Sequence, residues 1–165
     1  MRSAAWLSEG ARQAVYALKY GGLPRIAEDV AAAMVALRPP TDGPSAGALI
    51  PIPLARKRLR ERGYNQSEVL ARALARQWRI PVLRELLVRT RETPTQTALT
   101  PETRLANVAG AFAVAKPPTS AVVIVVDDVF TTGATLAEAA RALEQAGAKA
   151  VYGITFARAA IPDFS

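Results

Sequence analysis

The sequence predicts an α/β domain in which helices flank a mostly parallel sheet. Strand-like and helix-like segments alternate along the 165 residues, as they do in doubly wound α/β proteins. Residues 122–126 are apolar at every position, which is typical of a strand at the centre of a parallel sheet. Half of the residues are hydrophobic, so a sizeable core can form. We expect one domain over residues 1–165.

The N-terminal part, residues 1–40, is predicted to be a small helical hairpin. Apolar residues recur at helical spacing within residues 7–18, and two glycines then end that helix. A second apolar stripe covers residues 24–37 and starts at a proline, which suits a first helical position. Residues 39–46 form a loop by composition.

The α/β core is predicted to cover residues 47–158. Asn65 and Glu68 have the spacing of a capping box, and Trp78 shares a helical face with Leu70 and Leu74, which favours core packing over stacking on a base. The predicted elements are, in order, a strand at 48–52, the basic stretch 56–62, a helix after Asn65, a strand near 82–88, a polar loop at 89–100, a short helix to Asn107, a weaker strand at 110–114, the central strand at 122–126, a helix from about Thr135 to Gly147, and a strand at 151–157.

Composition restricts the chemistry. The chain has no histidine and no cysteine, which excludes disulfides, thiolate nucleophiles, cysteine-ligated zinc and Ser-His-Asp catalysis. Any reaction must use carboxylates, hydroxyls, arginines, backbone amides or a bound metal. No apolar run reaches the ~20 residues of a membrane span, and the N-terminus is unlike a signal peptide. We therefore expect a cytoplasmic protein.

The end of the central strand is the most informative segment. Asp127 and Asp128 follow the apolar run, at the edge where open α/β sheets bind their ligands. A turn rich in threonine and glycine and a helix N-terminus come next, and such a helix end suits a phosphate group. Two adjacent acids can hold the hydroxyls of a ribose, or order Mg²⁺ through water.

Other interpretations of this segment exist. The threonines and Gly133 could serve only to cap a helix, and the two acids could form a metal site of the phospho-receiver type. Neither G-x-x-x-x-G-K-[ST] nor G-x-G-x-x-G occurs in the chain. Acids at the end of a buried strand are costly unless they are liganded or solvated, which favours a phosphorylated ligand.

Residues 127–135 resemble the 5-phosphoribosyl 1-pyrophosphate (PRPP) signature of type I phosphoribosyltransferases. The resemblance implies that fold, PRPP with Mg²⁺, and contacts from Asp127 and Asp128 to the ribose hydroxyls, with Mg²⁺ bound indirectly. It also implies a loop around the 5′-phosphate, made of Val129, Phe130, Thr131, Thr132, Gly133, Ala134 and Thr135.

Further segments resemble the ComF family of competence-associated, phosphoribosyltransferase-like proteins. They are Leu18-Lys19-Tyr20-Gly21-Gly22, Pro51-Ile52-Pro53 with the basic stretch after it, Arg62-Gly63-Tyr64-Asn65-Gln66, and residues 89–96 continuing through Arg104, Asn107 and Phe112. Relatives usually begin with a four-cysteine zinc ribbon. Because this chain has no cysteine, we expect no ribbon and no zinc; the alternative is that the full product starts earlier.

Positive charge is concentrated in one segment. The net charge is +7, and residues 56–104 hold twelve of the 21 basic residues but five of the 14 acidic ones. Such a segment suggests a nucleic acid, a pyrophosphate or an anionic membrane surface as the partner, although a solvated basic surface has the same composition. The candidates for pyrophosphate or DNA are Arg56, Lys57, Arg58, Arg60 and Arg62.

The resemblance also implies a mobile loop that closes over the reacting centre. It would bring Arg89, Arg91 or Arg104 to the departing pyrophosphate, so these arginines join Asp127 and Asp128 as candidate catalytic residues. A solvated surface loop is the alternative. Lys19 is either a residue of the family motif or a cation that complements a helix end, and Tyr64 either stacks a base or packs.

The expected function is that of a ComF-like protein that binds PRPP or a related phosphoribosyl nucleotide. The resemblance implies a role in DNA uptake during natural transformation, with single-stranded DNA and a helicase of the uptake machinery as partners. The alternative is a metabolic phosphoribosyltransferase that acts on a nucleobase or another nitrogen acceptor. Phosphoribosyl transfer needs neither histidine nor cysteine, because charge stabilisation and positioning supply most of the catalysis.

Overall fold

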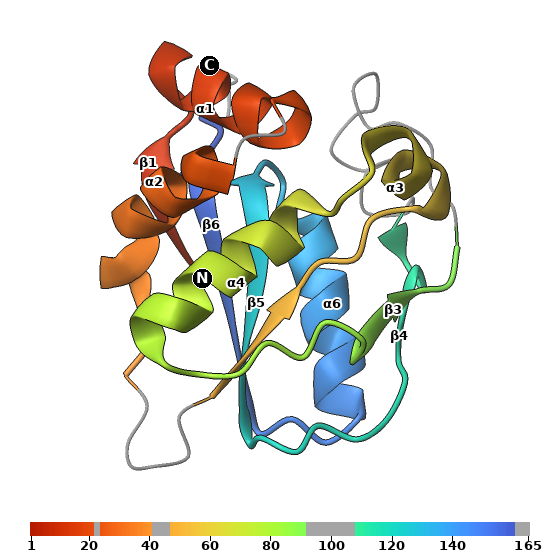
Figure 1. Ribbon diagram of the computed structural model, residues 1–165. Coiled ribbons are helices and arrows are strands. Elements are labelled where there is room, and N and C mark those ends of the chain that lie inside the picture. The colour runs from red at the N-terminus through yellow and green to blue at the C-terminus, as the bar shows by residue number, and fades with distance from the viewer. Residues whose placement is uncertain (22–23, 41–46, 92–107, 161–165) are drawn as a thin grey trace, which may run out of the picture.

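A four-stranded sheet with the order β1-β6-β5-β2 runs through the molecule, and all of its neighbouring strands are parallel. The structure is a computed structural model that describes residues 1–21, 24–40, 47–91 and 108–160. Figure 1 shows the four strands side by side at the centre. They are β1 (Arg2–Trp6), β2 (Ala48–Pro51), β5 (Val122–Phe130) and β6 (Ala150–Arg158).

β5 lies between an earlier strand, β2, and a later one, β6. Strand order reverses at such a point, and α/β sheets bind ligands at the carboxyl edge there. The sequence predicted that this strand ends at residue 126, but it continues to Phe130. The reason is its pairing with β6, which extends to Asp127 opposite Thr155 and Phe130 opposite Arg158. The two acids are therefore strand residues.

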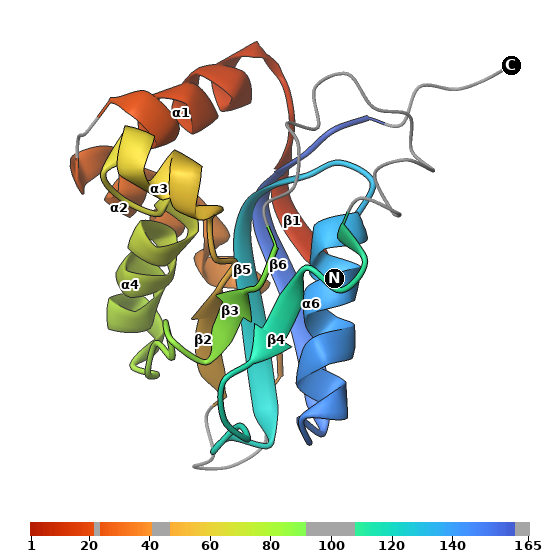
Figure 2. The same ribbon diagram turned by 90° about the vertical axis from the view of Figure 1, so that its right-hand side faces the viewer.

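Helices and a small ribbon cover the two faces of the sheet (Figure 2). On one face, Ile124 and Val126 pack with Leu70 and Leu74. On the other, Val123 and Val125 pack with α6. The elements of the first face are α1 (Glu9–Tyr20), α2 (Pro24–Met34) and α4 (Gln66–Trp78), and those of the second are α6 (Ala134–Gln145) and the antiparallel pair β3 (Leu87–Arg89) and β4 (Phe112–Val114).

Strand β1 was not predicted. It pairs with β6 in parallel, from Arg2 opposite Ile154 to Trp6 opposite Arg158, and Ser3 and Thr155 share a hydroxyl hydrogen bond of 2.7 Å. The segment is short and partly polar, so it lacks a clear strand pattern of alternating apolar residues. It forms a strand because it pairs with β6, which lies far away in the sequence. The two predicted helices of the N-terminal part are present as α1 and α2, which pack against each other.

The basic stretch, whose secondary structure was not predicted from the sequence, forms a short helix, α3 (Arg56–Arg62). The predicted core position of Trp78 is confirmed: it is 3% exposed and its Nε1 donates to Val35 O at 3.1 Å. The strand expected near 82–88 is shorter, with Val82 making only an isolated bridge to Leu49. The short helix expected before Asn107 lies outside the described residues. The short 3₁₀ helix η1 (Val35–Leu37) follows α2.

Candidate functional site

The two acids at the carboxyl end of β5 have different surroundings. Asp127 Oδ1 accepts hydrogen bonds from the hydroxyl of Ser67 and from the amide of Asp128, both at 2.9 Å. Asp128 Oδ1 accepts from the amide of Val129 at 2.8 Å. Asp128 Oδ2 is buried and forms an ion pair with Lys19 Nζ, which lies 3.0 Å away. Donors from α1, α4 and β5 itself thus meet at the carboxyl end of β5.

Burial and the charge of Asp128 together raise the pKa of Asp127 from 3.8 to about 7. The hydrogen bonds from the Asp128 amide and Ser67, and the charge of Lys19, lower the pKa by less. Because the pKa of Asp127 lies near neutral pH, a cation that binds beside this carboxyl favours its charged form. The acid pair is therefore suited to a ligand that brings positive charge or hydroxyl donors.

Lys19 ties the end of α1 to this pair. It lies in the last turn of α1, and its side chain is 28% exposed while that of Asp128 is 7% exposed. Its neighbour Leu18 is also held, because Tyr64 Oη donates to Leu18 O at 2.6 Å. Tyr64 is thus anchored at its hydroxyl, which favours the packing role over base stacking.

The start of α4 is positioned by Asn65. Its side chain caps the helix by accepting from Ser67 N at 3.1 Å, and its Nδ2 donates to Ile52 O at 2.9 Å, just beyond β2. This contact holds Ser67, which is fully buried, in place to reach Asp127. The predicted N-cap is confirmed, but the reciprocal bond of a capping box is absent, since Glu68 pairs with Arg72 instead.

The turn after β5 leads into α6 without a side-chain cap on its first residue. Gly133 is the N-cap residue and adopts φ +80°, and a Cβ there would lie 2.5 Å from Cε2 of Phe130. Thr132 Oγ1 accepts only a long bond, 3.4 Å, from Ala134 N. A small depression connects the turn with Asp127 and is lined by Asp127, Val129, Phe130, Thr131, Gly133, Ala134, Thr135 and Leu136. Val129 and Phe130 are still strand residues, so the turn proper is residues 131–133.

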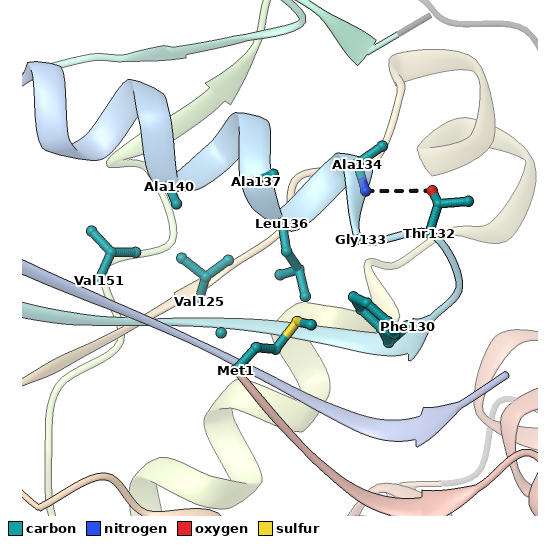
Figure 3. Close-up of a pocket in the computed structure, with 11 residues that line it drawn as sticks. Met1, Val125, Phe130, Thr132, Gly133, Ala134, Leu136, Ala137, Ala140 and Val151 are labelled. Carbon is teal, nitrogen blue, oxygen red and sulfur yellow. Dashed lines mark hydrogen bonds between the residues drawn. The ribbon is translucent and has the colours of Figure 1, made fainter. Parts of the chain in front are cut away.

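A larger groove of about 370 Å³ lies behind this turn. Figure 3 shows Met1, Leu136 and Phe130 among its lining side chains. Its lining is mostly apolar, and neither acid contributes to it. Asp127 lines the smaller depression alone. Of the predicted phosphate-loop residues, Phe130, Gly133 and Ala134 line both hollows, and Thr132 lines the groove.

The predicted basic residues begin α3, which follows β2 at the same edge of the sheet as the acids. Arg56, Lys57 and Arg60 are exposed, and Lys57 lies 4.0 Å from Glu61. Arg62 is more constrained: its guanidinium donates to Gln66 and stands 5.1 Å from the centre of the Tyr20 ring.

Of the three candidate loop arginines, Arg89 and Arg91 lie in the described part of the chain. Arg89 Nη1 donates to Pro53 O at 3.3 Å and its guanidinium stands 5.3 Å from the centre of the Phe112 ring. Arg91 Nη2 donates to Ala109 O at 2.8 Å. Both therefore make contacts that hold the β3–β4 region. Arg104 lies outside the described residues, and a closing role for any of the three stays a prediction.

The acid pair fits an indirect magnesium site better than a protein-only one. Its carboxylate oxygens are ligands that Mg²⁺ prefers, and Mg²⁺ commonly binds through one or two carboxylates plus substrate phosphates. Across residues 1–21, 24–40, 47–91 and 108–160 there is no cluster of three acidic side chains that could hold a metal alone. An ion at this edge would need further oxygens from a ligand or water.

Sequence reasoning missed one member of the site, Ser67, and the partner of another, Lys19. Ser67 was not singled out, and nothing in its local pattern marks it, because it meets Asp127 across 60 positions of the chain. Lys19 was noted, but its partner Asp128 could not be deduced from spacing.

In the described parts of the chain, no helix combines the length and apolar character needed to cross a membrane.

Comparison with known proteins identifies the family of the chain. The family model described as "Phosphoribosyl transferase domain" matches residues 64–161. Competence protein F of Haemophilus influenzae is 37% identical over 115 residues, 68% of this chain and 50% of that protein. DNA utilization protein YhgH of Escherichia coli K12 is 39% identical over 103 residues, 62% of this chain and 45% of that protein. The chain thus spans about half the length of these curated relatives.

Among solved structures, adenine phosphoribosyltransferase of Leishmania tarentolae is 15% identical, with a TM-score of 0.46 over 84% of this chain and 73% of that one. The family match, the parallel sheet and the acid pair at its switch point define the class: the chain belongs to the phosphoribosyl transferase domain family and has the type I fold. Within that class, its relatives assign it to the ComF family.

Proposed function

We propose that this protein binds PRPP, or a related phosphoribosyl nucleotide, together with Mg²⁺ at the carboxyl end of β5. The observation that supports this most is the juxtaposition of an acid pair with a helix N-terminus whose N-cap residue, Gly133, provides no side-chain cap. Free backbone N–H groups there suit a phosphate. Asp127 and Asp128 would hold the ribose hydroxyls, and Thr131, Thr132 and Thr135 would add hydroxyl donors.

The neighbouring charges fit the same ligand. α3 begins at the ligand edge of the sheet, so Arg56, Lys57 and Arg60 can reach a pyrophosphate from there. When bound, Mg²⁺ would neutralise part of the pyrophosphate charge. Lys19 forms an ion pair with Asp128. Burial and the charge of Asp128 raise the pKa of Asp127 to about 7, so Asp127 would respond to the charge of the ligand.

We further propose that the protein takes part in DNA uptake. This rests on the relatives named Competence protein F and DNA utilization protein YhgH. The exposed basic face of α3 would then contact single-stranded DNA, and a helicase of the uptake machinery would be a partner. A metabolic phosphoribosyltransferase is the competing function, and the same acid pair supports it.

Calorimetry tests the ligand. We expect PRPP to bind in the presence of Mg²⁺, and the double change Asp127→Asn with Asp128→Asn to weaken binding at least tenfold, since both ribose contacts and the ion's oxygens change. Asp29→Asn, an exposed acid on α2, is the matched control and should bind normally. Equal affinity of the double variant and the wild type would rule out this site. Pyrophosphate release that depends on an added nucleobase would favour the metabolic function.

A further inference from the structure

The junction between α3 and α4, residues 63–67, reaches both acids at the end of β5. Ser67 contacts Asp127 directly, with 2.9 Å between its hydroxyl and Oδ1. The route to Asp128 is indirect and passes through α1, which lies above α3 and α4 in Figure 2. The proposed function uses the two acids but gives no role to Tyr64, the residue on which this second route depends.

Tyr64 connects the junction to α1. Its hydroxyl donates to Leu18 O at 2.6 Å, at the short end of the range for such hydrogen bonds. Leu18 is buried and lies in the last turn of α1. Because the last four carbonyls of a helix have no partner within it, this bond satisfies a carbonyl that the helix itself leaves open. A hydroxyl 46 positions away in the sequence thus holds the end of α1.

A second contact holds the same turn. Tyr20, the last residue of α1, has the guanidinium carbon of Arg62 at 5.1 Å from the centre of its ring, within the range of cation–π contacts. Arg62 is fixed in turn by its hydrogen bond to Gln66, which is buried. The last turn of α1 is therefore held at its backbone and at a side chain, and both contacts come from the region where α3 meets α4.

The junction itself is firmly built. Gly63 ends α3 with φ +82°, and its amide donates to Leu59 O at 2.8 Å. Asn65 is the N-cap of α4 and also donates to Ile52 O at 2.9 Å. Tyr64 stands between these two capped helix ends, which leave its backbone little freedom. A group that must hold another one accurately is best carried by such a fixed element.

Lys19 lies between the two residues of α1 that are held, Leu18 and Tyr20. Its ammonium lies 3.0 Å from Asp128 Oδ2, and a lysine side chain loses much rotamer freedom when it is kept in one position. Whether it reaches Asp128 depends on where the last turn of α1 lies. If that turn shifts, the ammonium moves away and the buried carboxylate loses its counter-charge.

We propose that Tyr64 is a positioning residue that places Lys19 on Asp128 by holding the last turn of α1. It acts through Leu18 and Lys19 rather than on the acids themselves. The position of Lys19 does not depend on the proposed function. The consequence for ligand binding does rest on that function, because only a ligand at the acid pair would sense the ion pair.

Nuclear magnetic resonance of the lysine ammonium groups tests the position of Lys19 without a ligand. The other three lysines, Lys57, Lys116 and Lys149, are exposed. An ammonium group held in an ion pair exchanges its protons with water slowly enough to give a nitrogen–proton signal, and the signal missing from Lys19→Met is that of Lys19. We expect Tyr64→Phe, which removes only the hydroxyl, to speed this exchange about two- to tenfold, the factor that the loss of one hydrogen bond implies.

Tyr16→Phe is the matched control. It removes the hydroxyl of an exposed tyrosine on the same helix, and its Lys19 signal should match that of the wild type. The spectra are recorded well below the unfolding temperature of each variant, so that a general loss of stability does not move one lysine signal. An unchanged Lys19 signal in Tyr64→Phe overturns the proposal.

Calorimetry with PRPP and Mg²⁺ measures the consequence for the site. An Asp128 without its counter-charge repels the negative ligand, so we expect Tyr64→Phe to weaken binding about two- to tenfold. In a Lys19→Met background the same change should have an effect of less than about twofold, because no ammonium is left to place. A residue that only stabilises the fold would weaken binding equally in both backgrounds, and that result would overturn the role of Tyr64 at the site. If PRPP does not bind the wild type at all, the proposed function fails, while the Lys19 signal still decides whether Tyr64 positions Lys19.

Discussion

At the scale of single residues, the two adjacent acids differ because different groups face them. Asp128 has a lysine at 3.0 Å, whereas Asp127 has a hydroxyl and an amide, both neutral donors. A full charge compensates a buried carboxylate better than neutral donors do. The pair therefore combines one acid that has a direct counter-charge, Asp128, with one whose pKa is raised to about 7, Asp127.

The first prediction concerns stability against pH. Asp127 loses its proton near 3.8 when the chain is unfolded, but at about 7 in the folded protein. Between these values the folded state holds the extra proton, so the free energy of unfolding falls as pH rises from about 4 to 7, by up to about 1.4 kcal/mol per unit. Asp127→Asn should flatten this fall. Urea denaturation across that range measures it, and an unchanged slope would contradict the raised pKa; Asp29→Asn is the control.

The second prediction concerns Lys19. Lys19→Met leaves the Asp128 carboxylate buried without its counter-charge, so we expect a loss of about 1–3 kcal/mol in the free energy of unfolding. Lys149→Met, an exposed lysine at the other end of the sheet, should change it by less than about 0.5 kcal/mol. A double-mutant cycle with Asp128→Asn isolates the pair. Additive effects would show that Lys19 acts elsewhere.

At the scale of elements, the turn between β5 and α6 depends on Gly133. An alanine there would have to adopt φ +80° and avoid the Phe130 ring. We expect Gly133→Ala to cost about 1–3 kcal/mol and to weaken phosphate-ligand binding. Gly147 also has a positive φ, +102°, but nothing lies within 4 Å of an added Cβ, so Gly147→Ala should cost less. Thermal unfolding and calorimetry compare the two, and equal costs would contradict the steric argument.

The elements also show what could be predicted from the sequence and what could not. The central strand, α4 and α6 carry strong local patterns, and their existence was confirmed, as was the buried face that includes Trp78. β1 was missed because its order comes from pairing with β6, about 150 positions away. The Asp pair was identified because it follows an apolar run, but its partners Lys19 and Ser67 are brought there by packing alone.

At the scale of the whole molecule, charge is segregated. The basic excess within residues 56–104 begins with α3, which has no buried residue. If this face contacts single-stranded DNA, affinity should fall steeply with salt, and Arg58→Glu with Arg60→Glu should weaken DNA binding about tenfold or more without abolishing PRPP binding. Arg12→Glu is the control for net charge. Filter binding at several salt concentrations measures this, and salt-insensitive or undetectable binding would refute the DNA role.

The pairing of β1 with β6 sets an order on assembly. Arg2 to Trp6 precede their strand partner by about 150 positions, and within the described residues that partner is Ala150 to Arg158 alone. Until β6 is synthesised, β1 has no neighbour with which to form its hydrogen bonds. The edge of the sheet must therefore close late, after a long stretch of chain has already emerged, and contacts of such long range slow folding.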